Sequence, residues 1–281
     1  MIGPEAFARS LSIPSVKSKA DGSMWQYHSR SDDHSKKACW LVMLDLLLNC
    51  PLLRKHVSEG KVYFGINHEM RDFQQNRKKD LDLVLCVGAA SPKSSLPTFD
   101  ALAEPYGIVL TPEEQAQLNE LPSLRQAPVG SVLVALEAKA CMTEHVKARP
   151  RLFDELNSSH LTIHGATDEA IAVGLVVVNF ADSFISPGKA PDASGARPFN
   201  IHRQPGVTER VLEKVGELPR RSATGREGFD ALAAVLVDCR NDGHPVSLVT
   251  APPAPQPGDN LYYDSMILRI AQLYATRFVH H

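Results

Sequence analysis

Apolar residues along the chain form one long helical pattern and several shorter strand-like runs. Residues 35–60, SKKACWLVMLDLLLNCPLLRKHVSEG, repeat apolar side chains at helical spacing, so we predict a helix here that breaks at Pro51. Residues 61–67 and 80–88 are predicted strands. The continuous apolar run at 172–180 is typical of a strand that is buried on both faces.

Residues 131–180 predict a strand, a helix and a second strand. The first strand covers 131–139, and a polar helical stretch with Pro150 inside it covers about 143–158. A strand, helix and strand in this order favour two parallel strands joined by a crossover helix. We therefore expect an α/β fold with a mixed sheet.

The rest of the chain is predicted to surround this core. Residues 89–130 read as an insertion with a short helix, for which Thr111 is the expected N-cap, Pro112 the first helical residue and Glu114 its capping-box partner. No element is assigned to residues 1–23. The C-terminal third is predicted to contain a loop at 181–206, helices at 207–217 and 226–240, a short strand at 245–250, a Pro-rich connector at 251–258 and a helix at 262–278.

Composition sets limits on function and location. The 281 residues are 43% hydrophobic and 22% charged, and the net charge is −2, so any surface that binds nucleic acid must be local. The five cysteines form no CxxC pair, which favours a reducing compartment. No signal-peptide core and no run long enough to span a bilayer are visible, so we expect a cytoplasmic protein.

Charged residues interrupt two of the apolar strands. Glu137 and Lys139 lie two residues apart in VLVALEAK and so share one face of their strand, while Asp82 lies near the start of the 80–88 strand. If the two strands are neighbours, the two carboxylates converge. Two carboxylate ligands suit Mg²⁺, and Lys139 beside them can orient or deprotonate a water or neutralise charge on a phosphate.

This arrangement resembles the PD-(D/E)XK nuclease superfamily, which has the restriction-endonuclease-like fold. The family core is helix, strand, strand, strand, helix, strand, and residues 35–180, about half the chain, follow that order. The resemblance implies that Asp82, Glu137 and Lys139 are catalytic, with the Ala138 carbonyl as a further metal ligand. It implies Mg²⁺ as the cofactor, with Mn²⁺ as a substitute. Two departures are Leu81 where the family often has Pro, and the long spacing from Asp82 to Glu137, which requires the insertion to loop out of the sheet.

Other residues are alternatives or supporting candidates. Asp80 shares a face with Asp82 and can replace it as the ligand, and Glu69 is the candidate for an additional carboxylate that some relatives bring from the N-terminal side. Residues after the Glu-x-Lys strand can bind the DNA backbone: Thr143, His145, Lys147, Arg149 and Arg151. Each can equally be part of a solvated helix face. Glu137 and Lys139 can likewise be a solvated ion pair at a strand end.

The resemblance predicts a Mg²⁺-dependent endonuclease that cuts double-stranded DNA, of the kind that serves bacterial restriction or antiphage defence. One domain spans 1–281, with 181–281 available for oligomerisation, regulation or specificity. Relatives imply a homo-oligomer and, for some, a small-molecule activator such as a cyclic nucleotide. The alternatives are a nuclease for RNA or for single-stranded or branched DNA, and a non-catalytic nucleic-acid-binding or scaffold protein on the same fold. A complete trio favours the enzyme.

Overall fold

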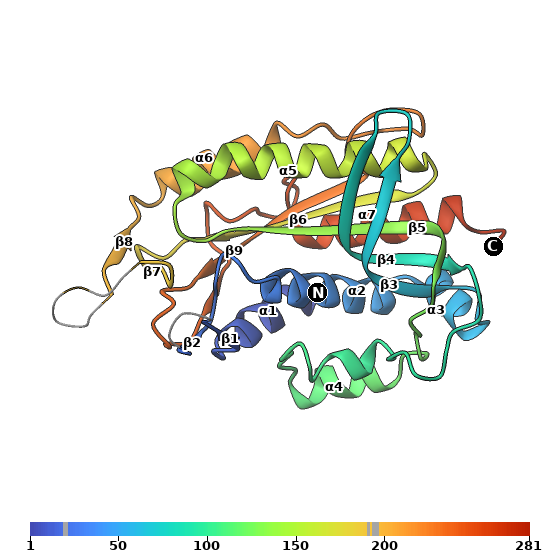
Figure 1. Cartoon of the computed structure of the whole chain (residues 1–281), viewed down its shortest axis with the longest axis horizontal. Helices are drawn as coiled ribbons and strands as arrows, with labels where there is room; N and C mark the ends of the chain where they lie inside the picture. Colours follow the sequence, from blue (N-terminus) through green and yellow to red (C-terminus); the bar gives the residue numbers. More distant parts are fainter. Residues whose placement is uncertain (19–21, 190–191, 193–196) are drawn as a thin grey trace.

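A six-stranded mixed sheet forms the centre of the protein, with strand order β10-β9-β6-β5-β4-β3 (Figure 1). Strands β5, β6 and β9 are parallel to one another, whereas β3, β4 and β10 are antiparallel to their neighbours. The computed structural model describes residues 1–18, 22–189, 192 and 197–281. The strands of the sheet are β3 (Tyr63–Asp72), β4 (Arg77–Gly88), β5 (Val129–Cys141), β6 (Ile171–Asn179), β9 (Ala231–Asp238) and β10 (Ser247–Val249).

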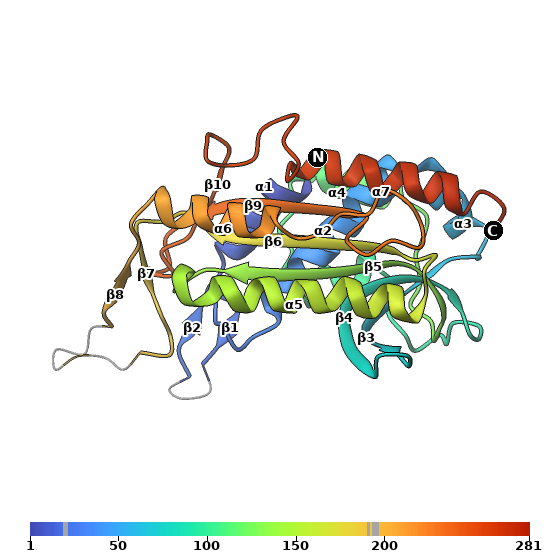
Figure 2. The same ribbon diagram turned by 90° about the horizontal axis from the view of Figure 1, so that it is seen from above.

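Helices cover both faces of this sheet (Figures 1 and 2). The helices on one face share a large apolar core with the sheet; they are α1 (Gly3–Leu11), α2 (Asp33–Asn49), α3 (Pro51–Ser58) and α7 (Tyr263–Arg277). The opposite face packs against α5 (His145–Ala166) and α6 (Gly206–Gly216) through a second core. Because β6 lies inside the sheet between both layers, all nine of its residues are buried.

Most elements predicted for the core are present. The long N-terminal helix divides at Pro51 into α2 and α3, and α5 connects the parallel strands β5 and β6. Strands β4 and β5 are paired, so the predicted insertion does leave the sheet between them, but it covers residues 89–128 because β5 already begins at Val129. This insertion contains a short 3-10 helix, η1 (Asp100–Leu102), and α4 (Pro112–Asn119), whose capping box between Thr111 and Glu114 is formed as predicted. The α/β class with a mixed, helix-flanked sheet is thus confirmed.

The predicted helix at 226–240 is wrong, because this segment contains strand β9. Seven of the eight β9 residues are buried, and β9 is paired with β6 on one side and β10 on the other. A surface helix exposes one face to water, whereas an interior strand is apolar on both faces. The alanine and leucine residues of ALAAVLVD suit a helix by local preference, and burial within the sheet overrides that preference.

Other boundaries also differ from those predicted. The second predicted strand, β4, begins at Arg77 rather than at Asp80, and α5 continues to Ala166. The predicted loop at 181–206 contains a small hairpin, β7 (Ser183–Ile185) and β8 (Phe199–Ile201). Within residues 1–23 lie α1 and the strand β1 (Val16–Lys17), which pairs with β2 (Met24–Trp25). Among the described residues, no helix is long and apolar enough to cross a membrane.

Candidate active site

The sheet opens between β4 and β5 at Asp82. The last residues paired across these strands are Leu83 and Leu136, and beyond them β4 stays paired only with β3. At the opening, the backbone N–H of Ala138 donates a hydrogen bond to Asp82 Oδ2 at 2.9 Å. The N–H and C=O of one residue in a strand point to the same side, so the Ala138 carbonyl also faces this gap.

Asp82 is held in the gap by groups from two other elements. Its Oδ2 accepts from β5 as described, and its Oδ1 lies 3.1 Å from the Ser35 hydroxyl at the start of α2. Burial raises the pKa of the Asp82 carboxyl, whereas the Ala138 N–H and the charge of Lys139 act in the opposite direction. Each carboxylate oxygen keeps a further lone pair, so Asp82 can still bind a cation.

Glu137 is the more deeply buried of the two predicted acids, at 1% exposure. Its Oε1 lies 2.6 Å from Lys139 Nζ and 3.5 Å from Lys79 Nζ in ion pairs. Neither carboxylate oxygen has a hydrogen-bond partner of good geometry among the described residues. Burial, followed by the negative charge of Asp82, raises the pKa of Glu137. A buried carboxylate without hydrogen bonds is costly, and a nearby cation offsets that cost.

Lys139 lies between Glu137 and solvent. Burial disfavours its charge, but Glu137, followed by Asp82 and Glu155, outweighs this effect and raises the pKa of Lys139. The Glu155 carboxylate of α5 is 3.9 Å from the Lys139 ammonium. The ammonium is therefore retained at neutral pH, and it shows that this position accommodates a positive charge beside Glu137.

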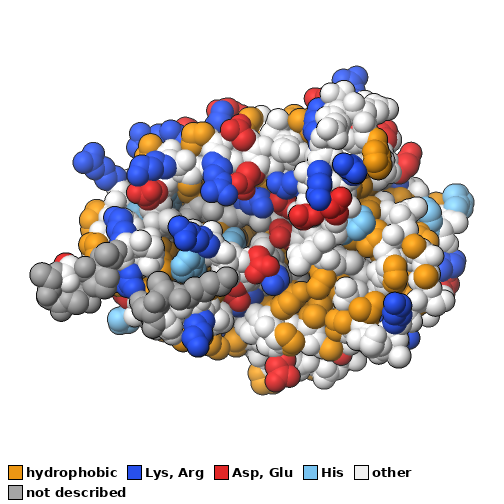
Figure 3. Space-filling model, viewed as in Figure 1, with side chains coloured by type: hydrophobic (Ala, Val, Ile, Leu, Met, Phe, Trp, Pro, Cys, Tyr) orange, Lys and Arg blue, Asp and Glu red, His pale blue; other side chains and the backbone are white. Residues whose placement is uncertain are grey.

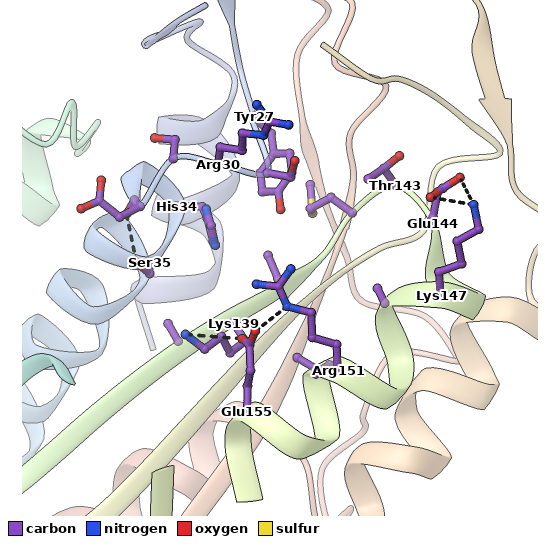
Figure 4. A pocket seen from close by; sticks show the side chains of 18 of the residues that line it. Tyr27, Arg30, His34, Ser35, Lys139, Thr143, Glu144, Lys147, Arg151 and Glu155 are labelled. Carbon is purple, nitrogen blue, oxygen red and sulfur yellow. Dashed lines mark hydrogen bonds and ion pairs between the residues drawn. The ribbon is translucent and has the colours of Figure 1, made fainter. Parts of the chain in front are cut away.

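A cleft of about 540 Å³ lies in front of this gap, between the start of α2 and the first turns of α5 (Figure 4). We call it the α2–α5 cleft. Lysine and arginine side chains gather on the same face of the molecule (Figure 3). Glu137 lies behind Lys139 and does not line the cleft. The polar residues that line it are Tyr27, Ser29, Arg30, Ser31, Asp32, His34, Ser35, Asp82, Lys139, Thr143, Glu144, Lys147, Arg151 and Glu155.

The groups at the gap that could hold a divalent cation are Asp82, Glu137 and the Ala138 carbonyl, and the Lys139 ammonium already lies beside Glu137. Mg²⁺ binds through one or two carboxylates and keeps several waters, so two acids suffice. In the described part of the chain, no group of three or more His, Cys, Asp and Glu residues is arranged to hold a metal ion.

The predicted phosphate-binding residues take different positions. Thr143, Lys147 and Arg151 line the α2–α5 cleft. Arg149 is half-buried and does not line it. His145 is buried, its Nε2 lies 2.7 Å from the Asn179 carbonyl, and burial lowers its pKa to about 4. His145 therefore faces the core and is not positioned to contact a phosphate.

The two alternative acids lie outside the cleft. Glu69 and Asp80 are opposite one another on β3 and β4, and both side chains are exposed. Glu69 forms an ion pair with Lys78. The geometry therefore favours Asp82 over Asp80 as the carboxylate at the gap between β4 and β5.

The sequence did not reveal one wall of the cleft. Residues 27–35, YHSRSDDHS, supply Arg30, His34 and the Ser35 hydroxyl that contacts Asp82. Burial, followed by the charge of Lys139, lowers the pKa of His34 to about 4, so a neutral imidazole faces the ammonium. The density of polar side chains just before a helix was the one available signal. Lys79, in the basic RKK segment, also reaches Glu137, which only the pairing of the strands reveals.

Comparison with known proteins adds no family assignment. The chain matches no family model, no curated protein and no solved structure. Evidence for its function therefore comes from the α2–α5 cleft and the residues around it.

Proposed function

We propose that the protein is a Mg²⁺-dependent endonuclease that hydrolyses phosphodiester bonds in double-stranded DNA, on a restriction-endonuclease-like fold. One observation carries this proposal. Asp82 of β4 accepts a hydrogen bond from Ala138 of β5 and lines an open cleft together with Lys139, and the buried Glu137 pairs with Lys139 behind it. Acids that can hold a cation, with a lysine beside them, are suited to phosphodiester hydrolysis.

The cation would be held by Asp82, Glu137 and the Ala138 carbonyl. When bound, Mg²⁺ supplies Lewis-acid chemistry, polarising a phosphoryl oxygen and lowering the pKa of water. The protein positions these ligands through neighbouring groups. The Ser35 hydroxyl and the Ala138 N–H fix the Asp82 carboxylate, and the extended backbone of β5 fixes Glu137.

Lys139 acts in this proposal through its charge. Without a cation, Glu137 and Asp82 raise the pKa of Lys139, and the resulting ammonium is suited to stabilise negative charge on the phosphate and to orient a water. Lys147 and Arg151 bind phosphates along α5. Lys147 forms an ion pair with Glu144, and Arg151 forms one with Glu155. A bound phosphate would have to replace these carboxylates as the partner of each cation.

The proposal makes a prediction about the metal. Mg²⁺ or Mn²⁺ should support cleavage of a plasmid, whereas Ca²⁺ should bind without supporting turnover, because its longer and looser coordination places a water poorly. The measurement is gel analysis of supercoiled plasmid with each ion in turn, with EDTA as the control. Activity that persists undiminished in EDTA would contradict a metal-dependent mechanism.

A second prediction concerns the salt dependence of binding. Lys147→Ala and Arg151→Ala should each weaken DNA binding and make the slope of log affinity against log salt shallower by about one. The measurement is a fluorescence-anisotropy titration with labelled duplex at several salt concentrations, in a Glu137→Gln background that prevents cleavage.

Lys55→Ala is the matched control for this titration. Lys55 is an exposed helical lysine with an acidic neighbour, Glu59, and it lies on α3, away from the α2–α5 cleft. Its loss should leave the slope unchanged. If Lys147→Ala and Arg151→Ala behave like Lys55→Ala, the start of α5 is only a solvated face and DNA binds elsewhere.

A further inference from the structure

Beyond the gap at Asp82, strands β3 and β4 leave the sheet as a two-stranded ribbon, residues 67–82 (Figures 1 and 2). Their turn, at residues 73–76, projects past the edge of the sheet next to α5. We call this segment the β3–β4 ribbon. Neither the cleft nor the proposed chemistry uses its tip.

The base of the turn is fixed in position. Asp72 is buried at 1% exposure, and its Oδ1 accepts hydrogen bonds from the backbone N–H groups of Gln74 and Gln75 at 2.9 and 3.1 Å. The side chain lies against Gly165 of α5, where a Cβ atom would overlap the Asp72 carboxylate. Met70 and Leu81 of the ribbon are buried in the core that contains α5. The ribbon is therefore anchored to the body of the protein.

The anchored turn holds an aromatic ring in water. Phe73 is 81% exposed, the highest value for any large hydrophobic side chain in the described part of the chain. The Arg71 guanidinium lies 5.5 Å from the centre of its ring. A single exposed ring needs no special explanation. Here, however, Asp72 fixes the turn that carries Phe73, and the Arg71 guanidinium lies over the ring, so the pair suits a partner that is both planar and anionic.

The rest of the tip has the chemistry of base recognition. Gln74, Gln75 and Asn76 are all exposed, and Arg71 and Arg77 flank them, while the one acid of the turn, Asp72, points inward. Glutamine and asparagine pair with adenine, arginine pairs with guanine, and the major groove of B-DNA admits a two-stranded β-ribbon. Lys78 forms an ion pair with Glu69, so the positive charge offered to a partner comes from Arg71 and Arg77.

We infer that the tip of the β3–β4 ribbon enters the major groove of the substrate duplex and reads base edges, with Phe73 in contact with the bases. This inference rests on the proposed function and adds a sequence-reading element to it. Asp82 is seven residues from Gln75, so at about 3.3 Å per residue the tip lies at most about 23 Å from the cleavage site. That length corresponds to about seven base pairs, so sequence preference should be strongest within that distance of the cut.

The wild-type protein is first used to map a cut site on DNA. The test then uses a short duplex with the sequence around that site. Affinities are measured by fluorescence anisotropy for the Glu137→Gln protein, alone and with Phe73→Ala or with Gln74→Ala and Gln75→Ala together. We expect each ribbon variant to lose about tenfold in affinity. The same substitutions in a protein that keeps Glu137, and so cuts DNA, should flatten base preference in sequenced cleavage products near the expected distance. Leu268→Ala and Gln115→Ala are matched controls, being an exposed apolar residue on α7 and an exposed glutamine on α4.

The outcomes separate this inference from the proposed function. Ribbon variants that bind and cut like the controls, in a protein that does cut DNA, overturn the ribbon's role and leave the nuclease standing. Equal affinity for an RNA duplex of the same sequence also overturns it, because the A-form major groove is too narrow for side chains to read. If the intact protein neither binds nor cuts DNA, both proposals fail. Because all three substituted side chains are exposed, thermal unfolding should be unchanged in every variant.

Discussion

Glu137→Gln should lower the rate of DNA cleavage by about three orders of magnitude, the largest effect we expect from a single substitution. The glutamine keeps the shape of the side chain and removes only the negative charge that the cation site requires. Lys139 retains Glu155 as a neighbouring acid at 3.9 Å, so the folded structure should persist. Initial rates on a labelled duplex in Mg²⁺ measure the loss, and circular dichroism checks the fold.

Glu113→Gln is the control for this substitution. Glu113 is an exposed acid in the first turn of α4, outside the α2–α5 cleft, and its loss should leave cleavage unchanged. A Glu137→Gln protein that is folded and cuts at the wild-type rate would show that the buried Glu137–Lys139 pair is structural. The active site would then have to be sought elsewhere.

Asp82→Asn should have an effect of similar size, about three orders of magnitude in rate, whereas Asp80→Asn should stay within about twofold of wild type. Asparagine can still accept the hydrogen bond from the Ala138 N–H, so the substitution removes the charge and keeps the contact. Asp80 is exposed and lies opposite Glu69 on the ribbon, away from Glu137. The same initial-rate assay compares the two variants.

The reverse result would assign the ligand to Asp80. That outcome would require the β3–β4 ribbon to rotate when the cation binds, because the structure directs Asp82 and not Asp80 into the gap with Ala138. Normal rates in both variants would leave Glu137 without a second acid and would contradict the cation site.

The order of core elements could be predicted because it depends on local patterns. Strands β5 and β6 each correspond to a run of consecutive apolar residues, and the helix break is marked by Pro51 itself. The charged residues within apolar strands predicted that Asp82 and Glu137 converge if their strands are neighbours, and the structure pairs β4 with β5. A charge in such a strand is informative because burying it without a partner is costly.

Long-range features could not be predicted in the same way. Strand β9 has an alanine-rich sequence whose local preference is helical, and only its position between β6 and β10 makes it a strand. The contact of Ser35 with Asp82 spans 47 residues, and that of Lys79 with Glu137 depends on how the ribbon leaves the sheet. His145 looked like a phosphate ligand, and the turn of α5 toward Asn179 buries it. None of these contacts leaves a periodic signal.

The measurement that tests the nuclease proposal most directly is the conversion of supercoiled plasmid to nicked and linear forms in Mg²⁺. Wild-type and Glu137→Gln proteins are purified in the same way and compared side by side, because a contaminating nuclease would be present in both. We expect the wild-type protein to cut the plasmid and the variant to leave it intact. Equal cleavage by both proteins, or no cleavage by either, would contradict the assignment of a metal-dependent nuclease site to Asp82, Glu137 and Lys139.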